Sequence, residues 1–452
     1  MSGHQTTSYF LIFLFIFVAN SQITPGNNLH AFLTSSYYYP KSQSLGDDSI
    51  ALVFSMRSES IRRQSQILTI FAENHTSNAT INTTIEIPNG KTTFPIFPTT
   101  STLPNMTKLS LLDGQQKIEI PFSTVSYEKN DVVVCISPQI LAERYQLLPL
   151  ALQTYKRYGA FVNMYVTSMR YGFFNYSTGY EKLGFVKMQP WILPRISKPF
   201  FENFDDFAQL AHTDCLLQFK ESSKFVAFLD LNELLIPRLA TNYHDEFANF
   251  VAANPTIDYL QYNRYNYETS AEASPFFLDV EEILQHLKYN GESESPRIVI
   301  PTHRLNVTWS QQQTALKTSV VPNNSVIRMK KFVVVDLFNP SNISLPFYLN
   351  QEGDYLMKIE DLEAIGDAFD DTTMISEVFL KLPGVKYPPV YVDLIENCIQ
   401  NQNINNCKVP EHRYVRCAQA VANFQTKLHN SSSTFYYLPF DTRFATLVKC
   451  SI

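Results

Sequence analysis

The chain has little charge and no excess of positive charge. Of its 452 residues, 17% are charged, and the formal net charge is −6. No basic field is present for a nucleic acid to follow, so we do not expect a polyanion partner. Apolar material is ample, at 45% of the chain with 34 Phe and 25 Tyr. The composition therefore predicts a globular protein with one large domain and appendages, or with two modest domains.

The N-terminal apolar run is too short for an ordinary transmembrane helix. It covers residues 9–19 and reads YFLIFLFIFVA. As a helix it would span roughly 16 Å, about half of the hydrocarbon core of a bilayer. This length suits a signal peptide or a short signal anchor, which we predict at residues 1–22. Either alternative places the remaining chain in the secretory lumen.

The cysteines lack the Cys-x-x-Cys spacing of a zinc site. Four of the six lie in the last 55 residues, which favours disulfides that pin a C-terminal region in an oxidising compartment, with buried free thiols as the alternative. Nine Asn-x-Ser/Thr triplets also fit a secretory protein. They begin at Asn74, Asn78, Asn82, Asn105, Asn175, Asn306, Asn323, Asn342 and Asn430.

The character of the sequence changes near residue 128. Residues 23–127 are rich in Ser, Thr, Asn and Pro, and we predict a stem with a small strand-rich region. Residues 128–430 alternate short apolar strands with helical patterns, which indicates an α/β domain with a mostly parallel sheet. Residues 431–452 are a C-terminal tail. The expected strands are 131–138, 161–168, 184–191 and 225–229, and the expected helices are 140–158 and 202–224.

Oxygen-bearing side chains follow the last of these strands. The segment KFVAFLDLNELLIPR, residues 224–238, runs from apolar residues into Asp230, Leu231, Asn232 and Glu233. In open α/β sheets, ligands bind beyond the carboxyl ends of the strands. Along an extended backbone, Asp230 and Asn232 would point to the same side, as a hard divalent cation requires. The pattern therefore predicts a nucleotide or metal site, with a plain strand-end turn as the alternative.

Three segments in this region resemble the glycosyltransferase family 92 domain, once called domain of unknown function 23. The resemblance covers roughly residues 129–430 and is dense from 131 to 238. The segments are VVVCISPQILAERYQLLPLALQTYKRYGAFVNMYVTSM, then WILP at 191–194, then AHTDCLLQFKESSKFVAFLDLNELLIP.

The resemblance implies a GT-A fold with a nucleotide-sugar site on a Rossmann-like sheet. It implies inverting transfer of a hexose, galactose from UDP-galactose, to a glycan, assisted by a divalent metal such as Mn²⁺. Asp230 and Asn232 would hold the metal, Glu233 would support the site, and His212 and Asp214 would contact the nucleotide. Asp214 has a surface or helix-packing role as its equal alternative. Membership also implies a single-pass type II Golgi protein with a lumenal domain, or else a secreted one.

The sequence departs from the family pattern in ways that leave a second hypothesis open. Asn232 stands where relatives commonly have a second Asp, and an amide oxygen brings no charge to a cation. The stretches 328–336 and 355–362 contain no His, although relatives place one in each. Lys330, Lys331 and Lys358 are possible phosphate contacts and are more simply surface residues.

No catalytic base can be assigned from the sequence. Asp336, Glu360, Asp361 and Glu363 lie in the right half of the chain, but acids in such positions usually lie on the surface. The alternative function is therefore an inactive relative that binds glycans or acts as a scaffold. A hydrolase is disfavoured because the chain has no nucleophile-elbow or paired-carboxylate signature.

Overall fold

The computed structural model describes most of the chain between residues 29 and 450. The described residues are 29–58, 65–86, 93–96, 99–113, 116–194, 204–272, 274, 277–306, 316–335, 356–375, 391, 394–395, 398, 415–423, 425–429, 433–437 and 442–450. No helix within these ranges is both long and apolar enough to cross a bilayer. The predicted anchor or signal at residues 1–22 lies outside them.

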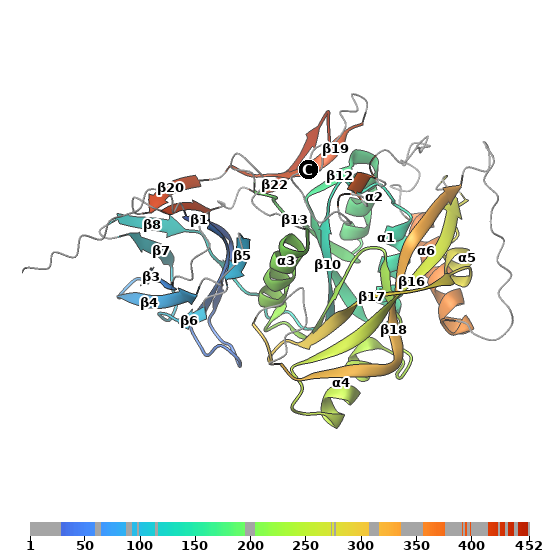
Figure 1. Ribbon diagram of the computed structural model, residues 1–452, viewed down its shortest axis with the longest axis horizontal. Helices are drawn as coiled ribbons and strands as arrows, with labels where there is room; N and C mark the ends of the chain where they lie inside the picture. Colours follow the sequence, from blue (N-terminus) through green and yellow to red (C-terminus); the bar gives the residue numbers. More distant parts are fainter. Residues whose placement is uncertain are drawn as a thin grey trace, which may run out of the picture.

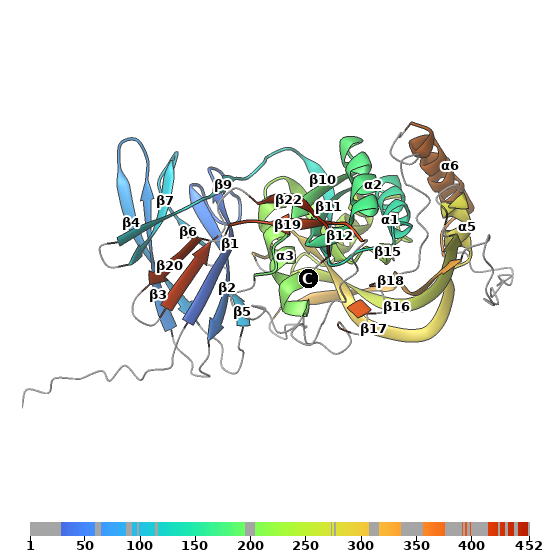
Figure 2. The same ribbon diagram turned by 90° about the horizontal axis from the view of Figure 1, so that it is seen from above.

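A curled sheet of eight strands forms the centre of the molecule (Figure 2). Its strand order is β13-β11-β10-β14-β17-β16-β18-β15. The bounds are β10 Asn130–Gln139, β11 Ala160–Val166, β13 Val186–Pro190, β14 Ser223–Leu229, β15 Glu233–Leu235, β16 Tyr259–Glu272, β17 Lys288–Pro301 and β18 Thr318–Val335.

The four strands predicted from apolar runs, β10, β11, β13 and β14, are all present and mutually parallel. Their order, third-second-first-fourth, is that of a doubly wound fold. The prediction of a mostly parallel sheet is wrong for the whole, because the sheet is mixed. β17 pairs antiparallel with both β14 and β16, and β15 pairs antiparallel with β18. β16 and β18, by contrast, pair in parallel, with β17 between them in the sequence.

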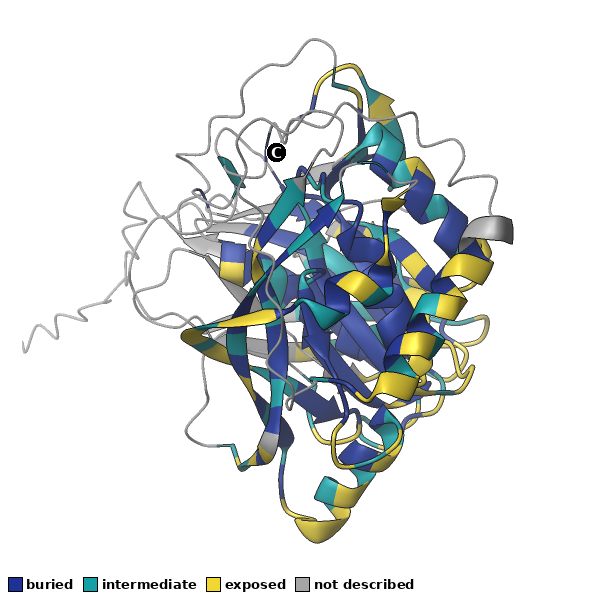
Figure 3. Cartoon of the chain, turned by 90° about the vertical axis from the view of Figure 1, so that its right-hand side faces the viewer, coloured by how far each residue is buried: buried dark blue, intermediate teal, exposed yellow. Residues whose placement is uncertain are grey.

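Helices cover both faces of the parallel strands. On β10, Val132, Val134 and Ile136 pack in the core shared with α1 and α2, whereas Val133 and Cys135 face α3. This burial on two faces explains the unbroken apolar run of the strand. Figure 3 shows the outer faces of the helices exposed around the buried sheet. The helices are α1 Leu147–Arg157, α2 Tyr171–Lys182, α3 Phe204–Phe219, α4 Tyr243–Ala253, α5 Val280–Gln285 and α6 Ile359–Ile375.

The first helix is shorter than its sequence pattern predicted. We expected it to begin at residue 140, but α1 begins at Leu147. Leu141 has a positive φ of 49°, which no right-handed helix accommodates. Its backbone N–H bonds the Ser168 hydroxyl at 2.9 Å, and Ala142 forms a bridge with Met169. Tertiary pairing therefore overrides the apolar spacing of residues 140–146.

Two sheets, one mixed and one antiparallel, pack into a sandwich within the predicted stem (Figure 1). One holds β1, β2, β5, β6 and β9, and the other holds β3, β4, β7 and β8. Strands β20 and β21, from near the C-terminus, complete the first sheet beside β1. The bounds are β1 Leu29–Tyr39, β2 Ser49–Ser58, β3 Ser65–Glu73, β4 Asn78–Glu86, β5 Thr93–Ile96, β6 Thr99–Ser101, β7 Lys108–Asp113, β8 Gln116–Ile120, β9 Ser123–Thr124, β20 Gln425–His429 and β21 Ser433–Tyr437.

A small third sheet connects the C-terminal strands to the central domain, one disulfide joins two C-terminal cysteines, and a second disulfide lies within the central domain. Strands β12 (Ser168–Arg170), β19 (Cys417–Val421) and β22 (Arg443–Leu447) form this sheet. The Cys417–Cys450 bridge lies beside it, as the prediction of C-terminal disulfides expected. A second bridge, Cys135–Cys215, ties β10 to α3. The alternative of buried free thiols is wrong for these four cysteines.

Candidate functional site

The Asp230–Glu233 turn lies at the point where the strand order of the sheet reverses. β11 and β13 continue the sheet on one side of β10, and β14 lies on the other. The carboxyl ends of β10 and β14 therefore meet there, which is the usual ligand position in such sheets. Ser137 near the end of β10 hydrogen-bonds the Asp230 side chain just after β14. The sequence prediction placed the turn correctly at this edge.

The backbone of the turn is not extended, contrary to our expectation. The Glu233 N–H donates to the Asp230 carbonyl at 3.0 Å, which closes a tight four-residue turn. Asn232 consequently faces β18, where its Nδ2 donates to the Met329 carbonyl at 3.3 Å. Its own carbonyl accepts the Met329 N–H at 2.8 Å. Asp230, which contacts Arg297, and Asn232, which contacts Met329, therefore do not converge on one side as predicted.

Arg297 of β17 connects the two carboxylates of the turn. Its Nε donates to Glu233 Oε2 at 2.7 Å, and its Nη2 donates to Glu233 Oε1 at 2.8 Å. Nη2 also donates to Asp230 Oδ2. Glu233 is fully buried and also accepts the Asp230 N–H at 2.9 Å. Glu233 thus supports the turn, whereas the side chains of Asp230 and Arg297 are 29% and 21% exposed.

Two more arginines extend this cluster across the sheet. Arg264 of β16 donates to Glu233 Oε1 at 2.7 Å and pairs with Glu294 at 2.9 Å. Arg328 of β18 also pairs with Glu294. Three arginines therefore face three carboxylates, those of Asp230, Glu233 and Glu294. We call these six residues the arginine cluster.

The ionisation of the pair at the rim follows from this arrangement. Burial opposes the charge on Asp230, but the positive charges of Arg297 and Arg328 outweigh burial and hold its pKa well below the usual range. Burial likewise opposes the charge on Arg297, and the two carboxylates outweigh it and raise its pKa. Both groups are therefore charged at neutral pH.

His212 joins the site through Ser137. Its Nε2 lies 3.0 Å from Ser137 Oγ, and its ring packs against Phe228 with centroids 4.9 Å apart. Because the Asp230 carboxylate can only accept, we assign the Ser137 hydroxyl proton to Asp230 and an Nε2–H donor to His212. Burial and repulsion by Arg297 lower the pKa of His212 to about 4, so the ring is neutral at pH 7. The structure therefore brings His212, Asp230 and Glu233 together.

Asp214 points to a different part of the molecule. It accepts hydrogen bonds from the hydroxyls of Tyr165 at 2.5 Å, Tyr37 at 2.8 Å and Ser35. Tyr37 and Ser35 belong to β1, so this carboxylate links α3 to the N-terminal sandwich. Burial raises its pKa, and the three hydroxyl donors counteract part of that effect. With 2% exposure, Asp214 is placed as the helix-packing alternative describes.

The side chains do not converge as the ligands of a divalent cation. Asp230 is paired with Arg297 and Ser137, and the Asn232 amide donates to Met329. Among the described residues, no group of three or more His, Cys, Asp or Glu side chains has a metal-binding arrangement. In this geometry, the oxygen-rich set that Mn²⁺ or Mg²⁺ prefers is not assembled around Asp230.

The other polar candidates from the sequence lie away from this cluster or at its margin. Lys330 pairs with Glu292 at 2.7 Å and Lys331 with Glu268 at 3.3 Å, which favours surface roles. Asp361 pairs with Arg157 at 2.7 Å, while Glu360 and Glu363 are exposed on α6. Asp336 lies outside the described residues.

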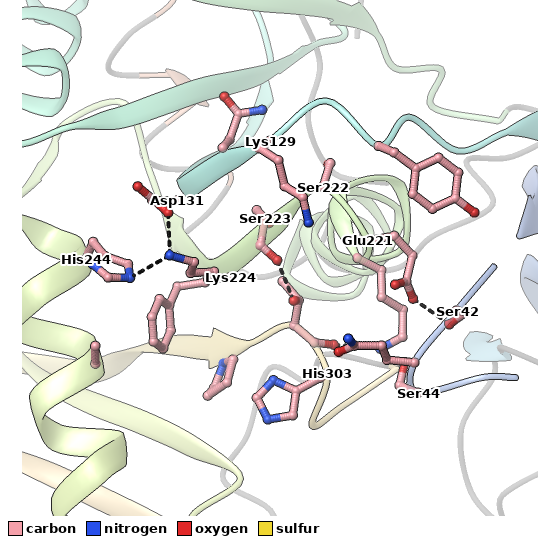
Figure 4. Close-up of a pocket in the computed structure, with 18 of the residues that line it drawn as sticks. Ser42, Ser44, Lys129, Asp131, Glu221, Ser222, Ser223, Lys224, His244 and His303 are labelled. Carbon is pink, nitrogen blue, oxygen red and sulfur yellow. Dashed lines mark hydrogen bonds and ion pairs between the residues drawn. The ribbon is translucent and has the colours of Figure 1, made fainter.

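A cavity of about 710 Å³ lies at the opposite end of the sheet (Figure 4). It is lined by Asp131 at the start of β10, Ser223 and Lys224 at the start of β14, and residues of the sandwich such as Ser42. The seven residues of β14 separate it from Asp230 by roughly 20 Å. Its Asp131–Lys224 pair, 2.8 Å apart, is exposed. This cavity is not at the ligand edge of the sheet, so we do not assign the nucleotide site to it.

A sequence model of the family described as Glycosyltransferase family 92 matches residues 130–373, more than half of the chain. The chain belongs to glycosyltransferase family 92. The matched range contains the parallel strands, the turn and the whole arginine cluster. The sequence resemblance is thereby confirmed.

Family members from Caenorhabditis elegans match most of the chain. Glycosyltransferase family 92 protein C33H5.2 is 30% identical over 90% of this chain and 88% of its own. Glycosyltransferase family 92 protein F13G3.3 is 30% identical over 81% and 76%. Among solved structures, S. aureus TarS 1-349 is similar to this family 92 chain with a TM-score of 0.27 and 14% identity, covering 44% of this chain and 60% of that one.

The arginines and Ser137 were not identified from the sequence of this family 92 member. Arg264 is a lone charge in the strand segment YLQYNRYNY, and Arg297 immediately precedes the apolar run IVIP. A charged residue inside a strand indicates that an oppositely charged side chain lies nearby, but only the strand register identifies that side chain. Register sets Arg264 opposite Glu294 and Glu233 opposite Arg328.

Proposed function

We propose that this family 92 protein transfers a hexose from a UDP-sugar to a glycan acceptor. Family membership is the observation that carries the proposal. The position of Asp230 and Arg297 at the strand-order switch supports it, because that edge is where this sheet type binds nucleotides. Galactose as the sugar and inversion at C1 are the finer parts of the proposal, and they rest on the family resemblance.

The proposed reaction needs stabilisation of a leaving group. The bond between C1 and the β-phosphate oxygen breaks, its electron pair leaves with UDP, and the acceptor oxygen bonds to C1 from the opposite face. A carboxylate base takes the acceptor proton, and none of the described residues can be assigned this role. Charge develops on the diphosphate, so a fixed cation near it lowers the barrier. A divalent metal would supply this positive charge. The side chains around Asp230 do not form a metal-binding set in the arrangement described above.

The secretory pathway is the compartment we propose. The Cys135–Cys215 and Cys417–Cys450 disulfides support it, because such bonds persist in oxidising compartments. Anchoring through residues 9–19, as a type II Golgi protein, is part of the same proposal. A reporter fused to each end of the chain, read by protease protection in microsomes, tests the orientation.

UDP release tests the activity directly. The full chain is incubated with UDP-galactose, UDP-glucose or UDP-GlcNAc and a fucosylated N-glycan core, and UDP and product are measured. We expect acceptor-dependent UDP release, greatest with UDP-galactose, and an inverted anomeric centre by NMR. Asp230→Ala should reduce release at least about tenfold. Asp131→Asn, a matched carboxylate at the other end of the same sheet, should leave it unchanged.

The alternative is a family member that binds glycans without transferring sugar. The neutral Asn232 and the Asp230–Arg297 pair favour it, since both reduce the negative charge available to a metal. That alternative predicts glycan binding on an array with no UDP binding and no UDP release. Such a result would overturn the transferase proposal.

A further inference from the structure

Arg297 lies beside Asp230, the residue that the sequence predicted to hold a metal. Its guanidinium lies between Asp230 and Glu233 and contacts both carboxylates. The cluster is balanced, with Arg264, Arg297 and Arg328 facing three carboxylates. A divalent cation at Asp230 would add two positive charges beside Arg297 and would first have to break a formed ion pair. The adjacent Arg297 repels such a cation, and the three carboxylates that could offset this repulsion are already paired with arginines.

Arg297 keeps part of its hydrogen-bonding capacity for a ligand. A guanidinium has five N–H donors. Nε and both N–H groups of Nη2 are accounted for by Glu233 and Asp230. Within the described residues, no hydrogen bond is formed by Nη1, which leaves two N–H groups. The side chain is 21% exposed, so these donors can meet a ligand at the rim.

The carboxylates fix the orientation of this arginine. The two-point contact with the fully buried Glu233 sets the plane of the guanidinium, and Asp230 holds its outer edge. A planar cation held in this way matches two oxygens of a phosphate, and it needs no rearrangement when charge develops. Glu233 and Asp230 are positioning residues in this arrangement.

We propose that Arg297 binds the diphosphate of the sugar-nucleotide donor and stabilises the UDP leaving group in place of a resident divalent cation. This inference rests on the proposed transferase function and assigns its cation. Arg297 forms and breaks no covalent bond, and it retains its proton throughout. The electron pair of the C1–O bond leaves with UDP, as in the proposed reaction. The negative charge on the phosphate then lies against the two Nη1 N–H groups.

Calorimetry with UDP and with uridine tests the assignment, because uridine lacks the phosphates. Binding is measured on the full chain in EDTA and again in Mn²⁺. We expect the Kd of UDP to agree within about threefold between the two conditions. We expect Arg297→Gln to weaken UDP binding at least tenfold while leaving uridine binding within twofold. Lys331→Gln, which removes an exposed cation on β18 that pairs with Glu268 outside the cluster, should change neither.

Two further variants guard against a loss caused by unfolding. Arg297→Lys retains the charge without the planar pair, so UDP affinity should fall less than in Arg297→Gln. The double variant Asp230→Asn with Arg297→Gln removes one charge of each sign and leaves the cluster neutral. It should retain the melting temperature better than Arg297→Gln alone and still show the selective loss of UDP over uridine.

The results separate this inference from the function on which it rests. UDP binding that appears only with Mn²⁺ overturns the arginine assignment and leaves a metal-assisted transferase. Equal losses of UDP and uridine in Arg297→Gln also overturn it, because the residue then acts through structure. Absence of UDP binding in both conditions overturns the transferase proposal and the inference together.

Discussion

Glu233 and Arg297 meet edge to edge, with Nε to Oε2 at 2.7 Å and Nη2 to Oε1 at 2.8 Å. Glu233 is inaccessible to solvent and also accepts a hydrogen bond from Arg264. The turn after β14 is thus built on a buried carboxylate that two arginines neutralise. The proposed donor binding would use the same pair, because Arg297 also carries the two Nη1 donors.

Glu233→Gln should strongly destabilise the fold. The amide retains the volume but removes the buried charge that Arg264 and Arg297 share, which leaves Arg264 with Glu294 and Arg297 with Asp230 as their remaining carboxylates. Breaking one side of a buried ion pair costs about 3–5 kcal/mol. Urea denaturation of wild type and variant measures the loss. Glu292→Gln, which removes an exposed partner of Lys330, is the matched change and should leave the denaturation midpoint in place. Equal midpoints for Glu233→Gln and wild type would contradict the assigned role.

Asp214→Ala should loosen the contact between α3 and the N-terminal sandwich. The change leaves the hydroxyls of Ser35, Tyr37 and Tyr165 without their shared acceptor. Each unpaired buried group costs about 1–3 kcal/mol, so the melting temperature should fall by several degrees. Asp205→Ala, an exposed acid on the same helix, is the control. Equal melting temperatures for the two variants would show that Asp214 does not stabilise the contact between α3 and the sandwich.

The parallel half of the sheet could be predicted because its signals are local. Val132–Ile136 is apolar on both faces, and the acidic turn follows β14 directly in sequence. Strand type and the ligand edge follow from such runs without knowledge of distant partners. The strands β16, β17 and β18 carry mixed polar sequences, and their pairing, antiparallel for β16 with β17 and parallel for β16 with β18, depends on register.

The candidate site was predictable only in part for the same reason. Asp230 and Glu233 could be found from one segment. Arg297 lies 64 residues after Glu233. Tyr37 and Ser35 on β1, which donate hydrogen bonds to Asp214, lie 177 and 179 residues before Asp214. No spacing rule connects residues that far apart. The prediction of an extended backbone at Asn232 was also wrong. The hydrogen bond from the Glu233 N–H to the Asp230 carbonyl closes a turn there, and the Asn232 side chain faces β18.

Removing the Cys135–Cys215 bridge should cost more than removing Cys417–Cys450. The first closes 80 residues of sequence and the second 33. Chain entropy gives roughly 4.5 and 3.7 kcal/mol for loops of these lengths. Paired Cys→Ala variants compared by denaturation under non-reducing conditions test the order. A larger loss for the C-terminal pair would show that native contacts, and not loop length, decide the difference.

Stability should depend on His212 between pH 6.5 and 4. Burial and repulsion by Arg297 place the folded pKa near 4, despite the nearby carboxylates of Asp230 and Glu233. The unfolded chain therefore binds a proton on acidification before the folded chain does, so stability falls as the pH drops through this window. The loss from this residue is up to about 3 kcal/mol. His212→Gln retains an N–H donor for Ser137 and cannot titrate. The free energies of unfolding of wild type and variant, measured across the window, should diverge by that amount, with wild type losing more. Parallel curves would mean that His212 titrates alike in the folded and unfolded chain.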